Sequence, residues 1–226
     1  MESPPARPSK RLTALIALAL LLALPFVAHS VTQGVDGLNG VEQREPTRFR
    51  HPDALLSNLG IFTHMIFGGV ITVLALLQAV PHIRTRWPKL HRISGRITVV
   101  GALLTALGGL IYIATQGTIG GVGMNAGFTL YGLLLAAAAT MTYRTARARN
   151  RAAHRRWGLR LVWLAIGSWL YRVQYGLWYA LTGGAGSTEA FTGPFDQVMF
   201  VGFFLPHLLL LELYLRRDVE PVPRHG

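Results

Sequence analysis

The stretch SNLGIFTHMIFGGVITVLALLQAV, residues 57–80, carries no charged side chain and decides the fold class. An α-helix rises about 1.5 Å per residue, so about 20 apolar residues cross the hydrocarbon of a bilayer. Because this stretch is long enough to do so, we predict that it forms a transmembrane helix.

Five more apolar runs accompany it, in a chain that is 51% hydrophobic and only 14% charged. Soluble domains are about one quarter charged, so the composition also indicates a membrane protein. We predict an all-α, polytopic transmembrane bundle of six spans with a four-helix core. The predicted spans are residues 12–31, 57–80, 97–115, 126–143, 159–181 and 196–215.

The runs predict three parts of the chain. Residues 1–56 form an N-terminal transmembrane helix and an extracytoplasmic loop, which we expect to be partly irregular from residue 32 on. Residues 57–182 form the four-helix membrane core, and residues 183–226 form the final helix and a cytoplasmic tail. The first run also has the charged start and apolar centre of a signal peptide, so a retained helix and a cleaved leader both stay open.

Basic residues gather on one side of the predicted membrane. Of the 22 Lys and Arg residues, 18 lie in the two tails and in the second and fourth connections. The positive-inside rule then places both termini in the cytoplasm, in a multi-pass protein of the cytoplasmic (inner) membrane. The expected partners are the lipid bilayer and anionic lipid headgroups at the cytoplasmic face. The basic clusters that set this topology explain the net charge of +12, so we expect no nucleic-acid partner.

Missing residues exclude several chemistries. The chain has no cysteine, so disulfides, thiolate metal sites and covalent haem attachment are excluded. The motifs G-x-x-x-x-G-K-S/T, H-E-x-x-H and G-x-S-x-G are absent as well. The sequence names no reaction, and a redox membrane protein is the enzyme class that stays open.

Two similar basic motifs precede the third and fifth predicted spans, KLHRISGRI at residues 89–97 and AAHRRWGLRL at residues 152–161. Each reads His-Arg-x-x-Gly with another Arg close behind, which indicates a weak internal repeat of two helical hairpins. With FTHMIFGGVITVLALLQ (62–78) and Arg172, they make residues 57–182 resemble the bacterial family of predicted membrane proteins catalogued as domain of unknown function 2306.

This resemblance implies a four-helix fold and no established activity. Gly158 and Leu161 stand where the family usually has Met and Ser, so the second motif departs from the family pattern. The resemblance maps the family's motif onto His64, His91, Gly95, Arg96, His154, Arg160 and Arg172.

A charged residue inside a predicted span is a candidate functional residue, and Arg172 is one. An Arg at the bilayer centre costs about 2.5–3.5 kcal/mol on insertion scales. Counted by helical rise, Arg172, His64 and His207 fall in one layer of the outer half of the membrane. No acid shares this layer, because Glu212 lies nearer the cytoplasm, where we expect it to pair with Arg216 at i, i+4.

Several groups are candidate partners for Arg172. Backbone carbonyls, tyrosine hydroxyls and neutral histidines accept hydrogen bonds, as does an anionic ligand. The alternative is that the long Arg side chain reaches outward to the headgroups.

A second candidate pair, His91 and His154, lies at the cytoplasmic boundary, with His91 just before the third span. Two axial imidazoles suffice to ligate b-type haem, so His64 with His207 could form an outer haem-binding pair and His91 with His154 an inner pair. Surrounding Arg residues would neutralise the propionates. The alternative is that the two histidines cap helices or contact lipid phosphates.

The sequence therefore predicts a His/Arg intramembrane pocket that binds an anionic or redox small molecule. The most specific form of this prediction is a pocket for b-type haem or a quinone. The alternatives are a transporter or sensor component in which Arg172 holds an anion, and a membrane scaffold without a ligand. The candidate cofactor-binding residues are His64, Arg172, His207, His91, His154, Arg96 and Arg160.

Overall fold

The computed structural model describes residues 10–40, 49–51 and 53–217, and this part of the chain is helical without a strand. The long apolar runs form the long helices, as their composition predicts. The helices are α1 (Lys10–Asn39), α2 (Leu55–Gln78), α3 (Pro81–Arg86), α4 (Pro88–Gln116), α5 (Gly121–Arg147), α6 (Arg151–Ala165), α7 (Gly167–Thr182), α8 (Pro194–Gly202) and α9 (Leu205–Arg217).

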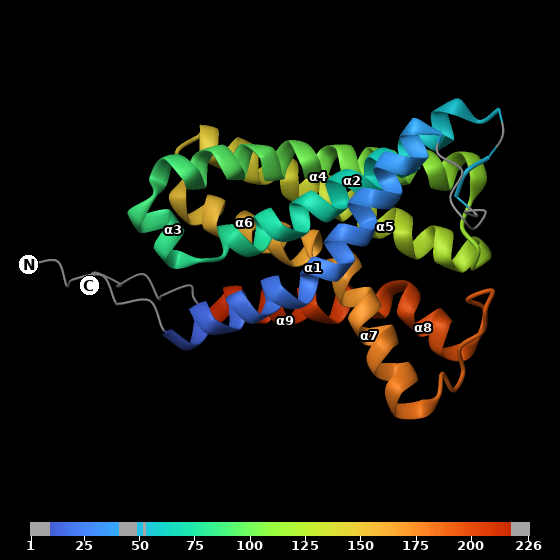
Figure 1. Ribbon diagram of the computed structural model, residues 1–226. Coiled ribbons are helices and arrows are strands. Elements are labelled where there is room, and N and C mark those ends of the chain that lie inside the picture. The colour runs from blue at the N-terminus through green and yellow to red at the C-terminus, as the bar shows by residue number, and fades with distance from the viewer. Residues whose placement is uncertain (1–9, 41–48, 52, 218–226) are drawn as a thin grey trace, which may run out of the picture.

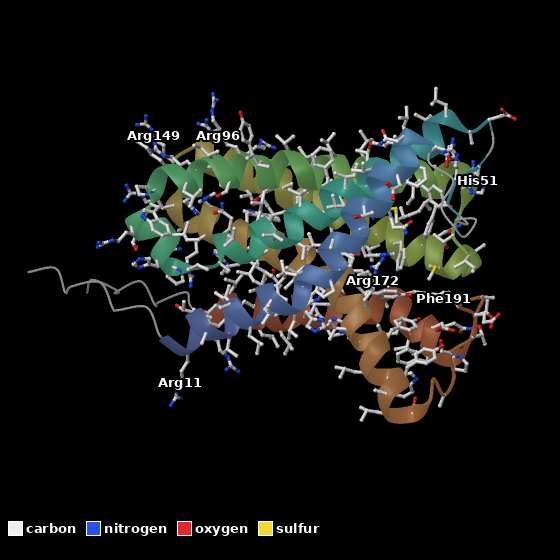
Figure 2. The ribbon with its side chains drawn as sticks, viewed as in Figure 1. Arg11, His51, Arg96, Arg149, Arg172 and Phe191 are labelled. Carbon is white, nitrogen blue, oxygen red and sulfur yellow. The ribbon has the colours of Figure 1, made fainter. Side chains whose placement is uncertain are left out.

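Four helices, α2, α4, α5 and α6, lie side by side, and α1 crosses them diagonally on the face of α2 (Figure 1). At one end of the molecule α1 begins, α9 ends, and the connections from α2 to α4 and from α5 to α6 turn back. Arg11, Arg96 and Arg149 lie at this end, whereas His51 and Phe191 lie at the other (Figure 2). The basic residues are thus gathered at one end of the bundle.

Five helical segments of the described chain are long and apolar enough to cross a membrane. They correspond to the first four predicted spans and the sixth. The fifth predicted span, residues 159–181, is not one continuous helix, because the chain breaks at Ile166 into α6 and α7. Six unbroken spans are therefore not confirmed. Each half has 15 or 16 residues and reaches about 23 Å, less than the roughly 30 Å of hydrocarbon.

Three predicted boundaries were wrong by several residues. The helix α1 continues to Asn39, although we expected an irregular loop from residue 32. Gly34 and Gly37 explain the extension, because α1 lies so close to α2 there that a Cβ on Gly37 would be 2.2 Å from the Phe62 ring. The basic motifs are helical too, since α4 begins at Pro88 and α6 at Arg151.

Small residues let α2 and α4 approach closely in the middle of the bundle. A Cβ on Gly108 of α4 would lie 2.3 Å from the carbonyl oxygen of Gly60 on α2. Such contacts are typical of helix pairs in membranes, where close packing replaces the hydrophobic effect as the source of association. This contact fixes the position of the next turn of α2, which carries His64.

Candidate functional site

The break between α6 and α7 lies against α2 and α5. The last carbonyls of a helix have no partner within it. Here Tyr131 on α5 donates its hydroxyl to the Leu164 carbonyl at 2.5 Å. The Thr72 hydroxyl on α2 donates to the Gly68 carbonyl of its own helix at 2.8 Å and lies 3.3 Å from the Ala165 carbonyl oxygen. Gly167 permits this arrangement, because a Cβ there would lie 2.8 Å from the Tyr131 hydroxyl oxygen.

The sixth predicted span contains a second break, between α8 and α9. Pro206 is the second residue of α9, and a proline ring disrupts the helical bonding of the turn before it. The two phenylalanines at this break pack on the ring of Tyr131, with centroid distances of 5.0 Å to Phe203 and 5.2 Å to Phe204. Tyr131 therefore contacts both helix breaks, one with its hydroxyl and the other with its ring.

Arg172 lies in the second turn of α7, and its guanidinium folds back toward the α6–α7 break. Its Nη1 donates to the carbonyl and the hydroxyl of Ser168, both at 3.0 Å. The guanidinium carbon is 4.7 Å from the centroid of the Phe26 ring on α1. Because Ser168 is one turn nearer the break, the charged group points away from the Thr182 end of α7 rather than toward it (Figure 2).

Three of the five N–H groups of Arg172, those on Nη2 and Nε, have no hydrogen-bond acceptor among the described residues. The acid on α8, Asp196, is fully buried and already satisfied. It accepts from the Tyr175 hydroxyl at 2.8 Å, the Ser187 hydroxyl at 2.7 Å and the backbone of Thr188 and Gly193. The side chain of Arg172 is exposed in the isolated chain, so an external acceptor can reach it.

His64 on α2 is half-buried and faces α4. Its Nδ1 lies 2.8 Å from the carbonyl oxygen of Thr105, so the neutral ring donates there and leaves Nε2 as an acceptor. Gly109 makes room for the ring, because a Cβ at that position would lie 2.8 Å from Nδ1. The Thr105 hydroxyl beside it is buried without a protein partner in the described chain.

The predicted layer comprises Arg172 on α7, His64 on α2 and His207 on α9, and the three side chains have different partners. Arg172 bonds to Ser168 beside the α6–α7 break, whereas His64 bonds to Thr105 on α4. His207, the third, lies instead between α9 and α6. Its ring stacks on Trp163 at 5.7 Å, and its Nδ1 is buried without a partner among the described residues.

Arg160 has a defined partner, and the pairing predicted for Glu212 was wrong. Arg160 on α6 forms a two-bonded ion pair with Glu212 on α9, at 2.5 Å and 2.8 Å. Arg216, which we expected to pair with Glu212, lies one turn further along α9. The planar guanidinium matches a carboxylate with two parallel bonds, which a neighbour on the same helix matches less well. The pair joins α6 to α9 and leaves Arg160 little capacity to bind a ligand.

The inner histidines lie at the end of the bundle where the basic residues gather. His154 Nδ1 is 3.1 Å from the Thr142 carbonyl oxygen, and His91 Nδ1 is buried without a hydrogen-bond partner among the described residues. Arg96 is exposed. Across the described ranges, no three His, Asp or Glu side chains are grouped so as to hold a metal ion.

Sequence reasoning missed the helix break and the residues that support it. Gly167 and Ser168 are adjacent, and Gly/Ser pairs are among the usual causes of helix kinks, so this pair was the available signal. Thr72 and Tyr131 carry no such signal, because only the fold brings them to the α6 carbonyls.

A family model described as "Predicted membrane protein (DUF2306)" matches residues 61–215. The match confirms the resemblance seen in the motifs and extends it past residue 182 through most of α9. Neither the search of curated proteins nor that of solved structures found a match. The Arg172 layer, both helix breaks and the Arg160–Glu212 pair all fall within the matched region.

Proposed function

The chain belongs to the predicted membrane protein family DUF2306, and we propose that it binds an anionic small molecule inside the membrane at Arg172. The shared chemistry of the ligand is an oxygen acid, such as a carboxylate or phosphate, attached to an apolar body that enters from the lipid. The family match identifies no ligand, so the proposal rests on the geometry around Arg172.

The topology of this proposal has six crossings, with α6 and α7 together making the fifth. Both termini face the cytoplasm of the inner membrane, and the basic end of the bundle is the cytoplasmic end. The break between α6 and α7 then lies in the interior of the membrane, and Arg172 lies between this break and the outer surface.

The observation that carries the proposal is the set of unpaired N–H groups on Arg172. Leaving a charged donor without an acceptor in a medium of low polarity is costly, and intramembrane charges are normally paired. The guanidinium points back toward the break instead of toward the outer headgroups, which disfavours the alternative of outward reach. A bidentate carboxylate or phosphate would satisfy Nη2 and Nε together.

The two helix breaks favour a transporter or sensor component over a scaffold without a ligand. Interrupted membrane helices are tolerated where their free backbone groups are satisfied by neighbours or line a cavity. In secondary transporters they form substrate sites near the middle of the bilayer. Here both breaks contact Tyr131, so a movement of either half-helix would be transmitted to the other through this one side chain.

The redox version of the proposal fits the residues less well. Haem held by His64 and His207 requires two facing imidazoles, yet His64 packs on α4 and His207 on Trp163 of α6. A quinone oxygen that accepts from Arg172 needs no second imidazole. Quinone binding is therefore the form of the redox proposal that these contacts favour.

The proposal is tested by measuring the unfolding temperature of detergent-purified protein with three probes that each carry a 10-carbon chain. Decanoate presents a carboxylate, decanol has the same chain without the charge, and decylubiquinone presents neutral oxygens. Ligand that binds only the folded state raises its stability. We expect decanoate to stabilise the wild type more than decanol, and this difference to vanish in Arg172→Gln and to persist in Arg96→Gln.

Two outcomes would overturn the anionic form of the proposal. One is a decanoate effect no larger than that of decanol in the wild type. The other is an equal effect in the wild type and Arg172→Gln. Stabilisation by decylubiquinone alone, lost in Arg172→Gln, would replace the anion with a quinone.

A further inference from the structure

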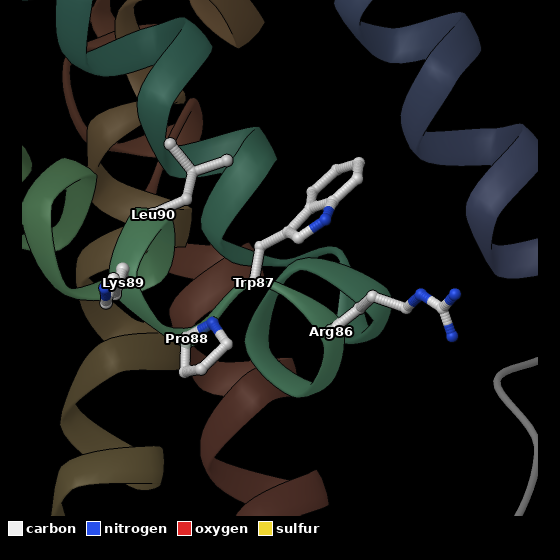
Figure 3. A pocket seen from close by; sticks show the side chains of 5 residues that line it. All are labelled: Arg86, Trp87, Pro88, Lys89 and Leu90. Carbon is white, nitrogen blue, oxygen red and sulfur yellow. The ribbon is translucent and has the colours of Figure 1, made fainter.

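The short elbow between α3 and α4, residues 86–90, combines a surface hollow with basic and aromatic side chains. The hollow has a volume of about 420 Å³ and is lined by Arg86, Trp87, Pro88, Lys89 and Leu90. Figure 3 shows Arg86 and Trp87 extending to the same side of the elbow.

The indole of Trp87 is held in place although it is 54% exposed. The ring of His82 on α3 meets it edge-on, with the centroids 5.9 Å apart. Pro88, the first residue of α4, restricts the backbone conformation of Trp87 before it. A tryptophan with one apolar face and a polar N–H is typical of the boundary between lipid and water.

Nothing in the neighbouring sequence neutralises this positive surface. Residues 54–188 contain no Asp or Glu, whereas the α3–α4 region carries Arg84, Arg86, Lys89, Arg92 and Arg96. A surface with this charge favours an anionic partner over a neutral one. Basic surfaces at the cytoplasmic side of membrane helices attract anionic lipids by about 1 kcal/mol per Lys or Arg.

An apolar stripe begins at the elbow and runs along α4. Leu90, Ile93, Ile97 and Val100 are all exposed and follow the three- and four-residue spacing of one helix face. Lys89 and Arg96 lie beside the stripe on the same side of the helix. A phospholipid whose phosphate lies at this basic elbow can therefore lay an acyl chain along α4, which a free phosphate ion cannot do.

We propose that this elbow, residues 86–90, is a binding site for the headgroup of an anionic phospholipid, whose acyl chain follows the exposed face of α4. The site is separate from Arg172 and does not depend on the function proposed for it. It would anchor the hairpin of α2 and α4 to the inner leaflet, and so hold the helix pair that carries His64.

Lipid binding to detergent-purified full-length protein tests the proposal by native mass spectrometry and thermal unfolding. The probes are phosphatidylglycerol, phosphatidylcholine and inorganic phosphate. The test variant is Arg86→Gln/Lys89→Gln, and the matched control is Arg144→Gln/Arg151→Gln, which removes two exposed charges from the α5–α6 connection. Removal of any two basic residues near the surface is expected to weaken phosphatidylglycerol binding roughly 25-fold, about fivefold per charge, so we expect this loss in the control. We expect a larger loss in the test variant, which should no longer prefer phosphatidylglycerol to phosphatidylcholine.

Three results would overturn the proposal. They are equal binding of phosphatidylglycerol and phosphatidylcholine by the wild type, equal loss in the test and control variants, and full stabilisation by inorganic phosphate. Unfolding of each variant in phosphatidylcholine shows whether it is folded. If the test variant is not folded, Leu90→Asn replaces it. Unchanged retention of phosphatidylglycerol by Leu90→Asn would contradict the proposal that the acyl chain follows the exposed face of α4.

Discussion

The hydroxyl of Tyr131 donates to the carbonyl oxygen of Leu164 at 2.5 Å and so joins α5 to α6 at the point where α6 ends. The same aromatic ring packs on Phe203 and Phe204, where α8 gives way to α9. One side chain thus supports two interrupted helices in the interior of the bundle. This arrangement places Arg172, which folds back toward the first break, next to the point where α6 ends and α7 begins.

Removal of the Tyr131 hydroxyl is expected to weaken the α6–α7 break. Hydrogen bonds inside membrane proteins contribute about 0.6 kcal/mol on average and up to about 1.7 kcal/mol. We expect Tyr131→Phe to lower the free energy of unfolding in mixed micelles by about 1 kcal/mol. Tyr143→Phe, on the exposed face of α5, is the control and should change it by less. Equal effects of the two substitutions would show that the bond to Leu164 contributes nothing.

The ion pair between Arg160 and Glu212 is expected to hold α9 on α6. Hydrogen bonds to charged groups contribute about 1.5–3 kcal/mol. We expect Glu212→Gln and Arg160→Gln each to destabilise the protein by about 2 kcal/mol, and the double variant by much less than the sum. Additive losses in this double-mutant cycle would contradict a direct pairing.

The contact of Gly108 with Gly60 is expected to tolerate no side chain. Overpacking costs about 1–3 kcal/mol, so Gly108→Ala should destabilise the protein by about that amount and displace His64. Gly158→Ala is the matched control, because nothing lies within 4 Å of a Cβ there. An alanine inside a helix is about 1 kcal/mol better than glycine, so this control should be neutral or stabilising. Thermal unfolding of both variants tests this prediction, and equal unfolding temperatures for the two would contradict it.

The proposed threading of the chain can be tested by cysteine labelling, since the wild type has no cysteine. A membrane-impermeant maleimide added to intact cells should label Glu189→Cys, in the connection from α7 to α8. It should label Arg149→Cys, between α5 and α6, only after the membrane is opened. Labelling of both positions from outside would place α6 and α7 on one side of the bilayer and refute a sixth crossing.

An absorbance spectrum after haem-sufficient expression tests the haem prediction. The contacts of His64 and His207 with different helices lead us to expect no Soret band that depends on both. A band lost in His64→Ala and in His207→Ala alike would restore the outer-layer haem. A band lost in His91→Ala and His154→Ala would assign the haem to the inner pair.

The sequence predicts the long helices well, because a stretch such as residues 57–80 has one physical solution in a bilayer. Its basic clusters also gather at one end of the bundle, as charge counting predicts. The sequence does not predict contacts that depend on how two helices pack against each other. Glu212 has a basic residue one turn away on α9, yet it pairs with Arg160, whose distance depends on how α6 and α9 cross.

Some residues of the candidate site can be predicted from the sequence, and others cannot. Arg172 stands out because a charge in an apolar run is visible in the sequence, and His64 shares its layer by helical rise alone. Tyr131 and Thr72 are unremarkable in sequence, since their roles arise from carbonyls that α6 exposes at its end. The direction in which Arg172 folds depends on Ser168, and no spacing rule predicts it.

Native mass spectrometry of protein purified from its membrane tests the central claim about Arg172 most directly. The account predicts a bound anionic small molecule on the wild type, weaker retention in Arg172→Lys, and none in Arg172→Gln. Arg86→Gln/Lys89→Gln should keep this molecule while losing phospholipid. Identical bound masses on the wild type and Arg172→Gln would contradict the account, because the guanidinium would then hold no ligand.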